Sequence, residues 1–429
     1  MNRAVSCFLA RHNFVNHADV LSVAQAISFD MAEGLSGGKS DQDMIRTFCN
    51  PPENPSAGKS VIVIDAGGTN FRSCLVTFDA QGKPGISFLE KTRMPGVEKE
   101  LTREEFFSQI AANISRLKDK ADRIGFCFSY PMRIQENGDG VLLGFSKEVK
   151  VPEAIGCEIG KCLKEVLLRD GWKSIEKITL CNDTVAALLA GAACAEPGTE
   201  YSSYIGMILG TGLNAAYIQP DSEEFGIKRQ IVVCESGKFR GMNRSGFDLD
   251  VDSKTVSPGT FVLEKLCSGA YLGPLSLSAL RSAASDGLFS EKLADGIRGI
   301  NALTLIDADG FLHEPYNKSN VLGRLAAESA SDEDYDRMYQ ILDAVAERSA
   351  RYAAAILVAC AVQTGGGRNA SRPVCILCNG TTFFKTWMIR NRVLGYLDEI
   401  LTGQMGIYWR MVSCDNDITL GAAIAGLIE

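Results

Sequence analysis

The chain has little of several residue types and segments that mark other classes of protein. It contains only three His among 429 residues, so a metal site built on imidazole ligands has few candidates. No apolar run reaches the roughly 18 residues of a membrane-spanning helix, and the apolar start of the chain is broken at Ser6 and ends at Arg11. We therefore expect no signal peptide, no membrane partner and a cytoplasmic location.

Positive charge is also scarce. Lys and Arg number 44 against 52 Asp and Glu, which gives a formal net charge of −8. Binding to a nucleic acid requires a cationic surface, so we expect no nucleic-acid partner. A small anion such as a nucleotide can still bind locally, through backbone N–H groups and a few cations.

The 14 Cys residues are scattered, and several lie inside apolar runs, such as Cys127 in IGFCFSY. This distribution predicts free thiols that pack as small hydrophobic groups in a reducing compartment. Cys375 and Cys378 have CxxC spacing, but no second pair follows at the spacing of a zinc ribbon. We therefore expect neither a metal nor a redox role for that pair.

The length of the chain predicts two domains, and one internal sequence repeat suggests how they are related. The segments 61–79 and 204–218 each read as strand, Gly-rich turn and strand, with a Gly-Thr step followed by an Asn. A strand at 374–377 ends in a third Gly-Thr step. The repeat predicts a duplicated core in which two similar α/β lobes present turns to one cleft. The Pro- and Gly-rich stretch 49–60 is a candidate domain boundary.

Apolar periodicity and turn residues predict the other elements. We expect strands at 123–128 and 176–181, a loop at 129–150, and helices at 5–35 (one or two), 102–120, 153–170, 332–362 and the C-terminal 418–429.

The first Gly-rich turn carries the strongest local indication of chemistry. Gly67 and Gly68 leave room for a polyphosphate to approach, and the N–H groups of such a turn form an anion-binding concavity. Thr69 and Asn70 add donors, Arg72 adds a cation, and Asp65 can orient Mg²⁺ through water. The alternative is a plain tight hairpin. No GK[ST] follows, so the turn is not a Walker A loop. Gly210 and Thr211 make the second turn a candidate phosphate-binding turn for the same reasons.

Three carboxylates are further candidates. Asp183, in the NDT step between a strand and an Ala-rich helix, is either a helix cap or the general base of a phosphoryl transfer. Glu235 and Glu264 stand among apolar residues and are either satisfied acids or hydrogen-bond partners of sugar hydroxyls.

A series of segments in one order resembles the hexokinase family of the eukaryotic type over nearly the full length of the chain. The segments are DAGGTNFR (65–72), GFCFSYP (125–131), GFSKEVK (144–150), NDT (182–184), ILGTGLNAAYI (208–218), CESGKF (234–239), FVLEKLCSGAYLG (261–273), CNGTTFFK (378–385) and LGAAIAG (420–426).

The resemblance implies a role for each matching residue. Asp183 matches the base that takes the proton of the sugar 6-hydroxyl, and Lys147 and Arg72 match cations at the transferring phosphoryl group. The sugar partners implied are Ser129, Ser146, Lys147, Asn182, Asp183, Asn214, Glu235 and Glu264; the ATP partners are Asp65, Gly67, Gly68, Thr69, Asn70, Arg72, Gly210, Thr211, Gly380 and Thr381. The cofactors implied are ATP and Mg²⁺, with no direct protein ligand to the metal and with Asp65 and Asp183 holding its waters.

The resemblance also implies a fold, namely the two-lobed α/β actin-like ATPase (ribonuclease H-like) architecture with an active-site cleft between the lobes. We expect a small lobe over 58–180, with the C-terminal helix 418–429 packed on it, and a large lobe made of 1–57 and 181–417. The activity implied is transfer of the γ-phosphoryl group of ATP to a hexose, glucose first, by a monomer or homodimer.

The sequence departs from the family pattern at several sites. Phe145–Ser146–Lys147 replaces Trp-Thr-Lys, Ser236 and Lys238 replace a Trp and an Ala after the first glutamate, and Met132 replaces a Cys. The adenosine turn and the approach to the last helix, DNDITLG, are altered too. These changes bear on sugar and nucleotide preference. The alternatives are a sugar sensor, against which Asp183 and Lys147 argue, another actin-like ATPase, and a bacterial ROK-type sugar kinase, whose Cys/His zinc cluster is missing.

Overall fold

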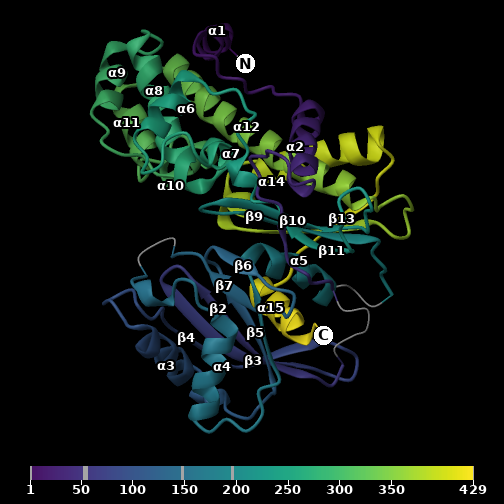
Figure 1. Cartoon of the computed structure of the whole chain (residues 1–429). Helices are drawn as coiled ribbons and strands as arrows, with labels where there is room; N and C mark the ends of the chain where they lie inside the picture. The colour runs from purple at the N-terminus through teal and green to yellow at the C-terminus, as the bar shows by residue number, and fades with distance from the viewer. Residues whose placement is uncertain (1, 52–56, 146–148, 195–197, 429) are drawn as a thin grey trace.

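The computed structural model describes residues 2–51, 57–145, 149–194 and 198–428. It contains a five-stranded sheet in the order β4-β3-β2-β5-β8, a six-stranded sheet in the order β1-β11-β10-β9-β12-β13, and a two-stranded sheet of β6 and β7. Figure 1 shows the two large sheets one above the other, each with its own set of helices on the outer side.

The five-stranded sheet is formed by the first half of the chain. Its strands are β2 (Ser60–Gly67), β3 (Asn70–Phe78), β4 (Pro84–Arg93), β5 (Arg123–Phe128) and β8 (Lys177–Cys181). β2, β3 and β4 are antiparallel neighbours, whereas β2, β5 and β8 run parallel. The central strands are apolar runs because both faces are covered. β4 escaped the sequence prediction because it is an exposed edge strand with a mixed pattern.

The six-stranded sheet repeats this arrangement. Its strands are β9 (Ser203–Leu209), β10 (Leu213–Gln219), β11 (Gln230–Val233), β12 (Val374–Asn379), β13 (Trp409–Val412) and the short edge strand β1 (Ile45–Arg46). Counted along the chain from β2 or from β9, the first strand of each half pairs antiparallel with the second and parallel with the fourth. The third strand follows the second on one side, and the fifth follows the fourth on the other. The predicted duplication is therefore confirmed.

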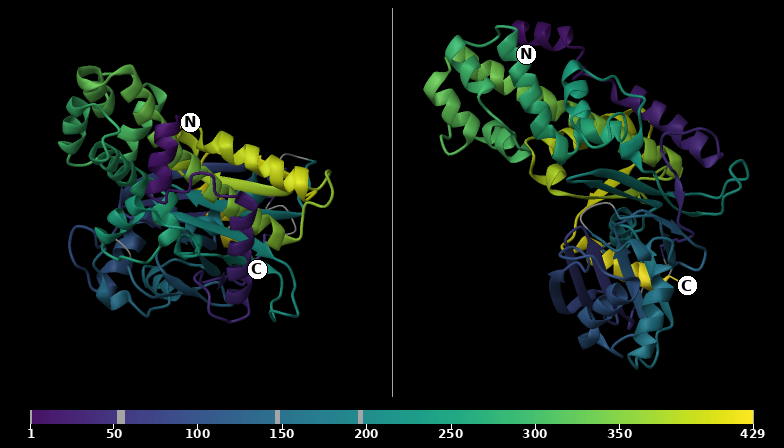
Figure 2. Two further views of the ribbon diagram at one scale, coloured as in Figure 1. Left: turned by 90° about the horizontal axis from the view of Figure 1, so that it is seen from above. Right: turned by 60° about the vertical axis from the view of Figure 1, so that its left-hand side comes forward.

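Two helices lie between the sheets, and each packs on the sheet of the other half. α5 (Asp183–Ala193) follows β8 but packs on β9 and β12, whereas α15 (Asp417–Leu427) follows β13 but packs on β2, β5 and β8. In the right-hand view of Figure 2, the yellow C-terminal helix lies in the blue lobe.

Small residues let α5 and α15 come close together. A Cβ added at Gly421 would lie 1.7 Å from the carbonyl oxygen of Ala186, and one at Gly125 of β5 would lie 1.8 Å from that of Ala422. Only glycine fits at these two positions. The apolar side chains around this contact form one buried cluster, shared by strands of both sheets.

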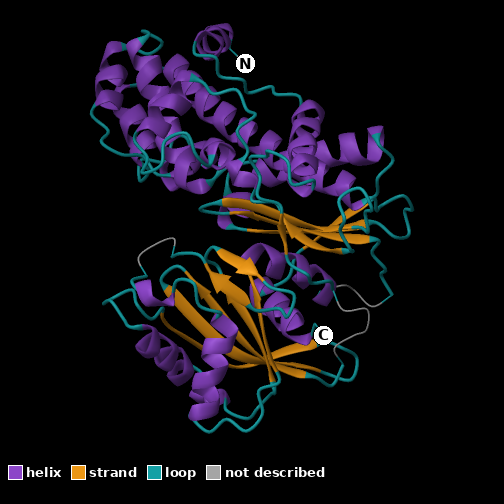
Figure 3. Cartoon of the chain, viewed as in Figure 1, coloured by secondary structure: helices purple, strands orange, loops and turns teal. Residues whose placement is uncertain are grey.

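The remaining helices cover the outer faces of the sheets (Figure 3). α3 (Arg103–Asn113) and α4 (Ile159–Arg169) belong to the first half of the chain. On the other sheet lie α1 (Arg3–Arg11), α2 (Val20–Leu35), α6 (Gly246–Ser253), α7 (Val262–Cys267), α8 (Gly269–Ser285), α9 (Glu291–Arg298), α10 (Leu305–His313), α11 (Val321–Ser329), α12 (Asp332–Thr364), α13 (Thr381–Lys385) and α14 (Ile389–Leu397). None of the helices within the described ranges is long and apolar enough to cross a membrane.

Three sequence predictions of local structure were wrong in part. The predicted loop 129–150 contains the hairpin of β6 (Met132–Ile134) and β7 (Gly140–Leu142). The helix predicted at 153–170 begins only at Ile159, because the buried carboxylate of Asp139 accepts hydrogen bonds from Gly160 N and Lys161 N and fixes the first turn there. The helix predicted at 102–120 ends at Asn113 and is followed by a 3₁₀ turn.

One prediction about the cysteines also needs correction. Cys194, at the end of α5, and Cys414, after β13, form a disulfide with a Cα–Cα distance of 6.4 Å across 220 residues of sequence. The other twelve are free thiols, and Cys375 and Cys378 are buried in β12. Within the described ranges, no group of three or more His, Cys, Asp or Glu side chains could hold a metal ion.

All five strands of the first sheet lie between Ser60 and Cys181, and α15 packs against three of them. The lobe boundaries at 58–180 and 181–417 stay a prediction.

Candidate active site

A cavity of about 340 Å³ brings together five of the predicted sugar partners. They come from both halves of the chain: Ser129 follows β5, Asn182 and Asp183 begin α5, Asn214 lies on β10 and Glu235 follows β11. The volume falls in the range of small-molecule sites in proteins. Residues more than 100 positions apart thus face one space that is large enough for a hexose.

The start of α5 shows which of its polar residues caps the helix, and so distinguishes the two roles considered for Asp183, helix cap and general base. The side chain of Asn182 accepts a hydrogen bond from Val185 N at 2.8 Å, so Asn182, and not Asp183, caps the helix. Asp183 is the first helical residue, and its Oδ1 accepts a hydrogen bond from the Thr184 hydroxyl at 3.2 Å. The capping explanation for Asp183 is therefore wrong, and Asp183 lines the cavity.

The first Gly-rich turn lies beside Ser129. Gly68 has a φ of +65°, a conformation that favours glycine, and Tyr130 donates a hydrogen bond to its carbonyl oxygen at 3.0 Å. A Cβ at Gly67 would lie 3.5 Å from the Ser129 hydroxyl. Thr69 and Asn70 are exposed, so their side chains are open to a ligand. The turn predicted to bind phosphate thus adjoins the cavity predicted to bind sugar.

Asp65 lies near other negative charges, an environment that favours a bound cation. Burial raises the pKa of its carboxyl group; Arg72, with a nitrogen 3.4 Å away, lowers that pKa, and the negative charges of Asp183 and Asp417 raise it again. Carboxylate oxygens are the ligands that Mg²⁺ prefers. Asp65 and Asp183 are therefore the residues of this site that could hold a magnesium ion, as the sequence predicted.

The second and third Gly-rich turns touch one another. Gly380 has a φ of +120°, and a Cβ there would lie 2.2 Å from the carbonyl oxygen of Leu209. A Cβ at Gly210 would lie 3.6 Å from the Gly380 Cα. The Thr382 hydroxyl donates to the carbonyl oxygen of Gly210 at 2.8 Å. Because β9 and β12 are parallel neighbours, Thr211 and Thr381 follow strands that end at the same sheet edge.

Glu235 is held in a strained backbone conformation. Its φ is +57°, uncommon for a residue with a side chain, and such positions cluster at functional sites. Its Oε1 accepts a hydrogen bond from Asn214 Nδ2 at 2.7 Å. Burial raises the pKa of Glu235; Lys238 and the Asn214 amide lower it, and Asp43 and Asp183 raise it. Asn214 and Glu235 thus form a preset pair of polar groups in the cavity wall.

Glu264 lies beside the cavity rather than in its wall as the described residues define it. Its Oε2 accepts a hydrogen bond from Leu213 N at 2.9 Å, next in the chain to Asn214. A Cβ at Gly212 would lie 2.8 Å from the same oxygen. Burial raises the pKa of Glu264, whereas the Leu213 N–H and the charge of Lys265 lower it. The carboxylate therefore sits between the second Gly-rich turn and the Asn214–Glu235 pair.

The structure adds residues that motif analysis missed. Asp43 lines the cavity and pairs with Lys238 at 2.5 Å, and the Lys238 ammonium lies 5.7 Å from the ring centroid of Phe261, another wall residue. Lys238 was noted only as a departure from the family pattern. Asp43 gave no signal, because it belongs to none of the motifs and lies in the loop between α2 and β1. Ser146 and Lys147 lie outside the described residues, so their roles stay predictions.

Two sheets of the same topology are joined by a pair of exchanged helices and carry three Gly-rich turns beside a cavity lined by an aspartate. These features define the class of two-lobed sugar phosphotransferases with the actin-like ATPase fold. Solved structures agree with this fold. The hexokinase of Schistosoma mansoni complexed with glucose matches with a TM-score of 0.76 and 21% identity, and a second hexokinase crystal structure with 0.81 and 20%; both cover 99% of each chain.

The chain belongs to the hexokinase family. Two family models described as hexokinase match residues 9–193 and 204–428. Among curated proteins, Hexokinase-1 of Schizosaccharomyces pombe is 26% identical over 93% of this chain and 85% of the relative. Hexokinase-1 of Nicotiana tabacum is 28% identical over 79% of this chain and 72% of the relative. The protein is thus a sugar kinase, a hexose phosphotransferase, as the sequence predicted.

Proposed function

We propose that the protein transfers the γ-phosphoryl group of ATP to the 6-hydroxyl of a hexose, and that Asp183 accepts the proton of that hydroxyl. The observation that carries the proposal is the position of Asp183. It lines the cavity together with Ser129, Asn182, Asn214 and Glu235, and its charge acts on Asp65 beside the first Gly-rich turn. One carboxylate therefore lines the sugar pocket and lies near enough to Asp65 for the two charges to interact.

The hexose is held by hydrogen bonds from groups that are already oriented. Asn214 and Glu235 are fixed by their mutual bond, Asn182 by its cap to Val185, and Glu264 by Leu213 N. Preset polar groups lose little entropy on binding, and they reject molecules that leave them unpaired. Glucose is the first candidate, because the S. mansoni hexokinase with the same fold is described as complexed with glucose.

The phosphate groups of ATP are held by the Gly67–Asn70 and Gly210–Thr211 turns, and Gly380–Thr381 takes the adenosine side. Arg72 supplies positive charge near the transferring group. The bond between the sugar oxygen and the γ-phosphorus forms while the bond from that phosphorus to the β-phosphate oxygen breaks, and ADP leaves. The hydroxyl proton passes to the Asp183 carboxylate. Asp65 and Asp183 would hold Mg²⁺ through its waters, and the ion would supply charge that neutralises the phosphates.

Rotation of the two sheets toward each other would close the cavity. The exposed side chains of Leu143 and Phe261 both line it, one from each half of the chain. Closure would bury these apolar groups, expel water and limit transfer of phosphate to water. Ser146 and Lys147 complete the sugar loop in this proposal. We also propose a cytoplasmic location and a monomeric or homodimeric state, to be checked by cell fractionation and sedimentation.

The test is ADP release by the purified protein with Mg-ATP and a panel of glucose, mannose, fructose, galactose, glucosamine and N-acetylglucosamine, with Asp183→Ala as the control. Sugar-dependent release that the variant loses supports the kinase and ranks its substrates. Sugar binding without any release would instead favour a sensor. It would point to Ser236 and Lys238, because Lys238 adds a cation to the cavity wall.

A further inference from the structure

Helix α6 carries three aspartates at alternate positions, and each binds a different neighbouring element. Asp248 forms two bonds with Arg348 of α12, at 2.7 and 2.8 Å, and both side chains are buried. Asp250 accepts a hydrogen bond from Ser278 of α8 at 2.8 Å. Asp252 accepts one from Lys265 of α7 at 2.5 Å. Of these three elements, only α7 carries a residue assigned to the hexose, namely Glu264.

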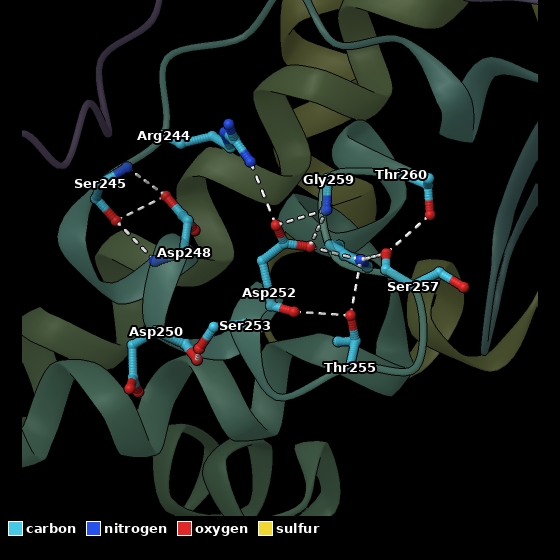
Figure 4. Close-up of polar contacts among 11 residues, drawn as sticks. Arg244, Ser245, Asp248, Asp250, Asp252, Ser253, Thr255, Ser257, Gly259 and Thr260 are labelled. Atoms are coloured by element: carbon cyan, nitrogen blue, oxygen red, sulfur yellow. Dashed lines mark hydrogen bonds and ion pairs between the residues drawn. The ribbon is translucent and has the colours of Figure 1, made fainter.

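The Asp252–Lys265 pair organises the loop between α6 and α7. Lys265 is 7% exposed, and its ammonium donates to Asp252 Oδ1, to the Thr255 hydroxyl at 2.9 Å and to the Ser257 carbonyl at 2.7 Å. Asp252 also accepts from Gly259 N at 2.9 Å. Figure 4 shows Asp252 facing Thr255, Ser257 and Gly259. All three ammonium donors are used, so the loop is wrapped around one buried charge.

The loop ends at the cavity. Phe261, a wall residue, has a φ of +50° and precedes α7, and its carbonyl oxygen accepts from Lys265 N at 3.0 Å. α7 has only six residues, and a helix this short does not hold its place through its own hydrogen bonds. Its position therefore depends on tertiary contacts, which include the packing of Leu263 and Leu266 in the core and the bonds of Lys265. Lys265 directly follows Glu264, and Ser268, the residue after the helix, donates its N–H to the Glu264 carbonyl at 2.8 Å.

We propose that Asp252 is a positioning residue for hexose binding: through Lys265 it holds the 254–261 loop and α7 so that Phe261 and Glu264 face the sugar. This inference rests on the proposed function, in which Glu264 binds a hexose hydroxyl. A buried ion pair is by itself weak evidence for stability, and in some proteins it instead fixes one arrangement. The pair here fixes the element that carries the sugar ligand.

The test compares Asp252→Asn with Asp250→Asn, a matched control that removes a negative charge from the same helix where it contacts a different element. Asp252→Asn leaves Lys265 without its counter-ion, so α7 shifts. We expect the hexose KM to rise about tenfold, the loss typical of one charged hydrogen bond, with the ATP KM within about twofold of the parent. Asp250→Asn should leave both constants near the parent values.

Three further variants separate positioning from a structural role. Glu264→Gln should raise the hexose KM, and adding Asp252→Asn to it should raise KM little further, because residues that act through one another are not additive. Thr255→Val removes a single Lys265 partner, should give a smaller rise in the same direction, and carries the test if Asp252→Asn does not fold.

The outcomes distinguish the two proposals. If Glu264→Gln leaves the hexose KM unchanged, the assignment of Glu264 to the hexose fails, and the inference fails with it. If Glu264→Gln raises the hexose KM but Asp252→Asn and Thr255→Val do not, only the inference is wrong. A double variant whose effects add fully, or an equal rise in the KM of ATP, would overturn the positioning role as well.

Discussion

Replacing Asp183 by Asn removes a negative charge from the cavity while the local fold is kept. The helix retains its cap, because the bond to Val185 N comes from Asn182. An Asn side chain can still accept the hydrogen bond from Thr184. The loss of an acidic group from the first turn costs about 0.3–1 kcal/mol of helix stability. Part of this is offset, because Asp183 repels the charges of Asp65 and Glu235.

The effect on catalysis should be much larger than the effect on folding. A general base contributes about 10²–10⁴-fold to a rate, which corresponds to about 3–5 kcal/mol of activation free energy. An amide cannot accept the hydroxyl proton, so we expect kcat to fall by that factor. The hexose dissociation constant should change little, since Asn182, Asn214 and Glu235 stay in place.

The measurements are kcat by coupled ADP release, hexose binding by calorimetry and the midpoint of thermal unfolding. Asp417→Asn is the matched control, because Asp417 is another acidic residue that raises the pKa of Asp65, yet it is bound to Asn379 at 2.6 Å and does not line the cavity. We expect its kcat to stay within about tenfold of the parent. A kcat for Asp183→Asn as high as that of Asp417→Asn would refute the assignment of the base.

Two other predictions follow from burial and packing. Burial raises the pKa of Glu235 and Lys238 lowers it. Because the ionised carboxylate binds the hexose above that pKa and loses this ability as pH falls through it, the hexose KM of Lys238→Met should begin to rise at a higher pH than that of the parent. Superimposable pH profiles of the hexose KM would contradict this prediction. Gly421→Ala forces a methyl group against Ala186 and should lower the free energy of unfolding in urea by about 1–3 kcal/mol. The control Gly395→Ala lies in a helix with open space around the added methyl group and should not be destabilised in this way. Equal urea midpoints for the two variants would show that the contact between the helices is loose.

Local chemistry could be predicted from the sequence where it is carried by neighbouring residues. The turn at Gly67–Gly68 needs glycine for a close approach, and it forms where the motif placed it. The repeated Gly-Thr step with an Asn close behind predicted the duplicated sheets, because each copy forms the same hairpin.

Features that depend on distant residues could not be predicted. Asp43 enters the cavity only because the chain after α2 pairs with β11, and the Cys194–Cys414 disulfide joins segments 220 residues apart. The start of α4 is set by Asp139, a residue that lies 20 positions earlier in the chain than Ile159. In each case the decisive partner is chosen by tertiary structure, which periodicity and propensity do not record.

The exchange of α5 and α15 between the two sheets ties the two halves of the chain to one another. Each half ends in a helix that covers the other half's sheet, so neither half contains the helix that its own inner sheet face requires. A chain cut between the halves would leave the apolar side chains of Val61, Val63 and Cys74 facing water, and a surface of that kind favours aggregation over folding. The two copies of the repeat are thus a single unit of folding, and a single copy of this architecture would have needed a second copy beside it to be stable.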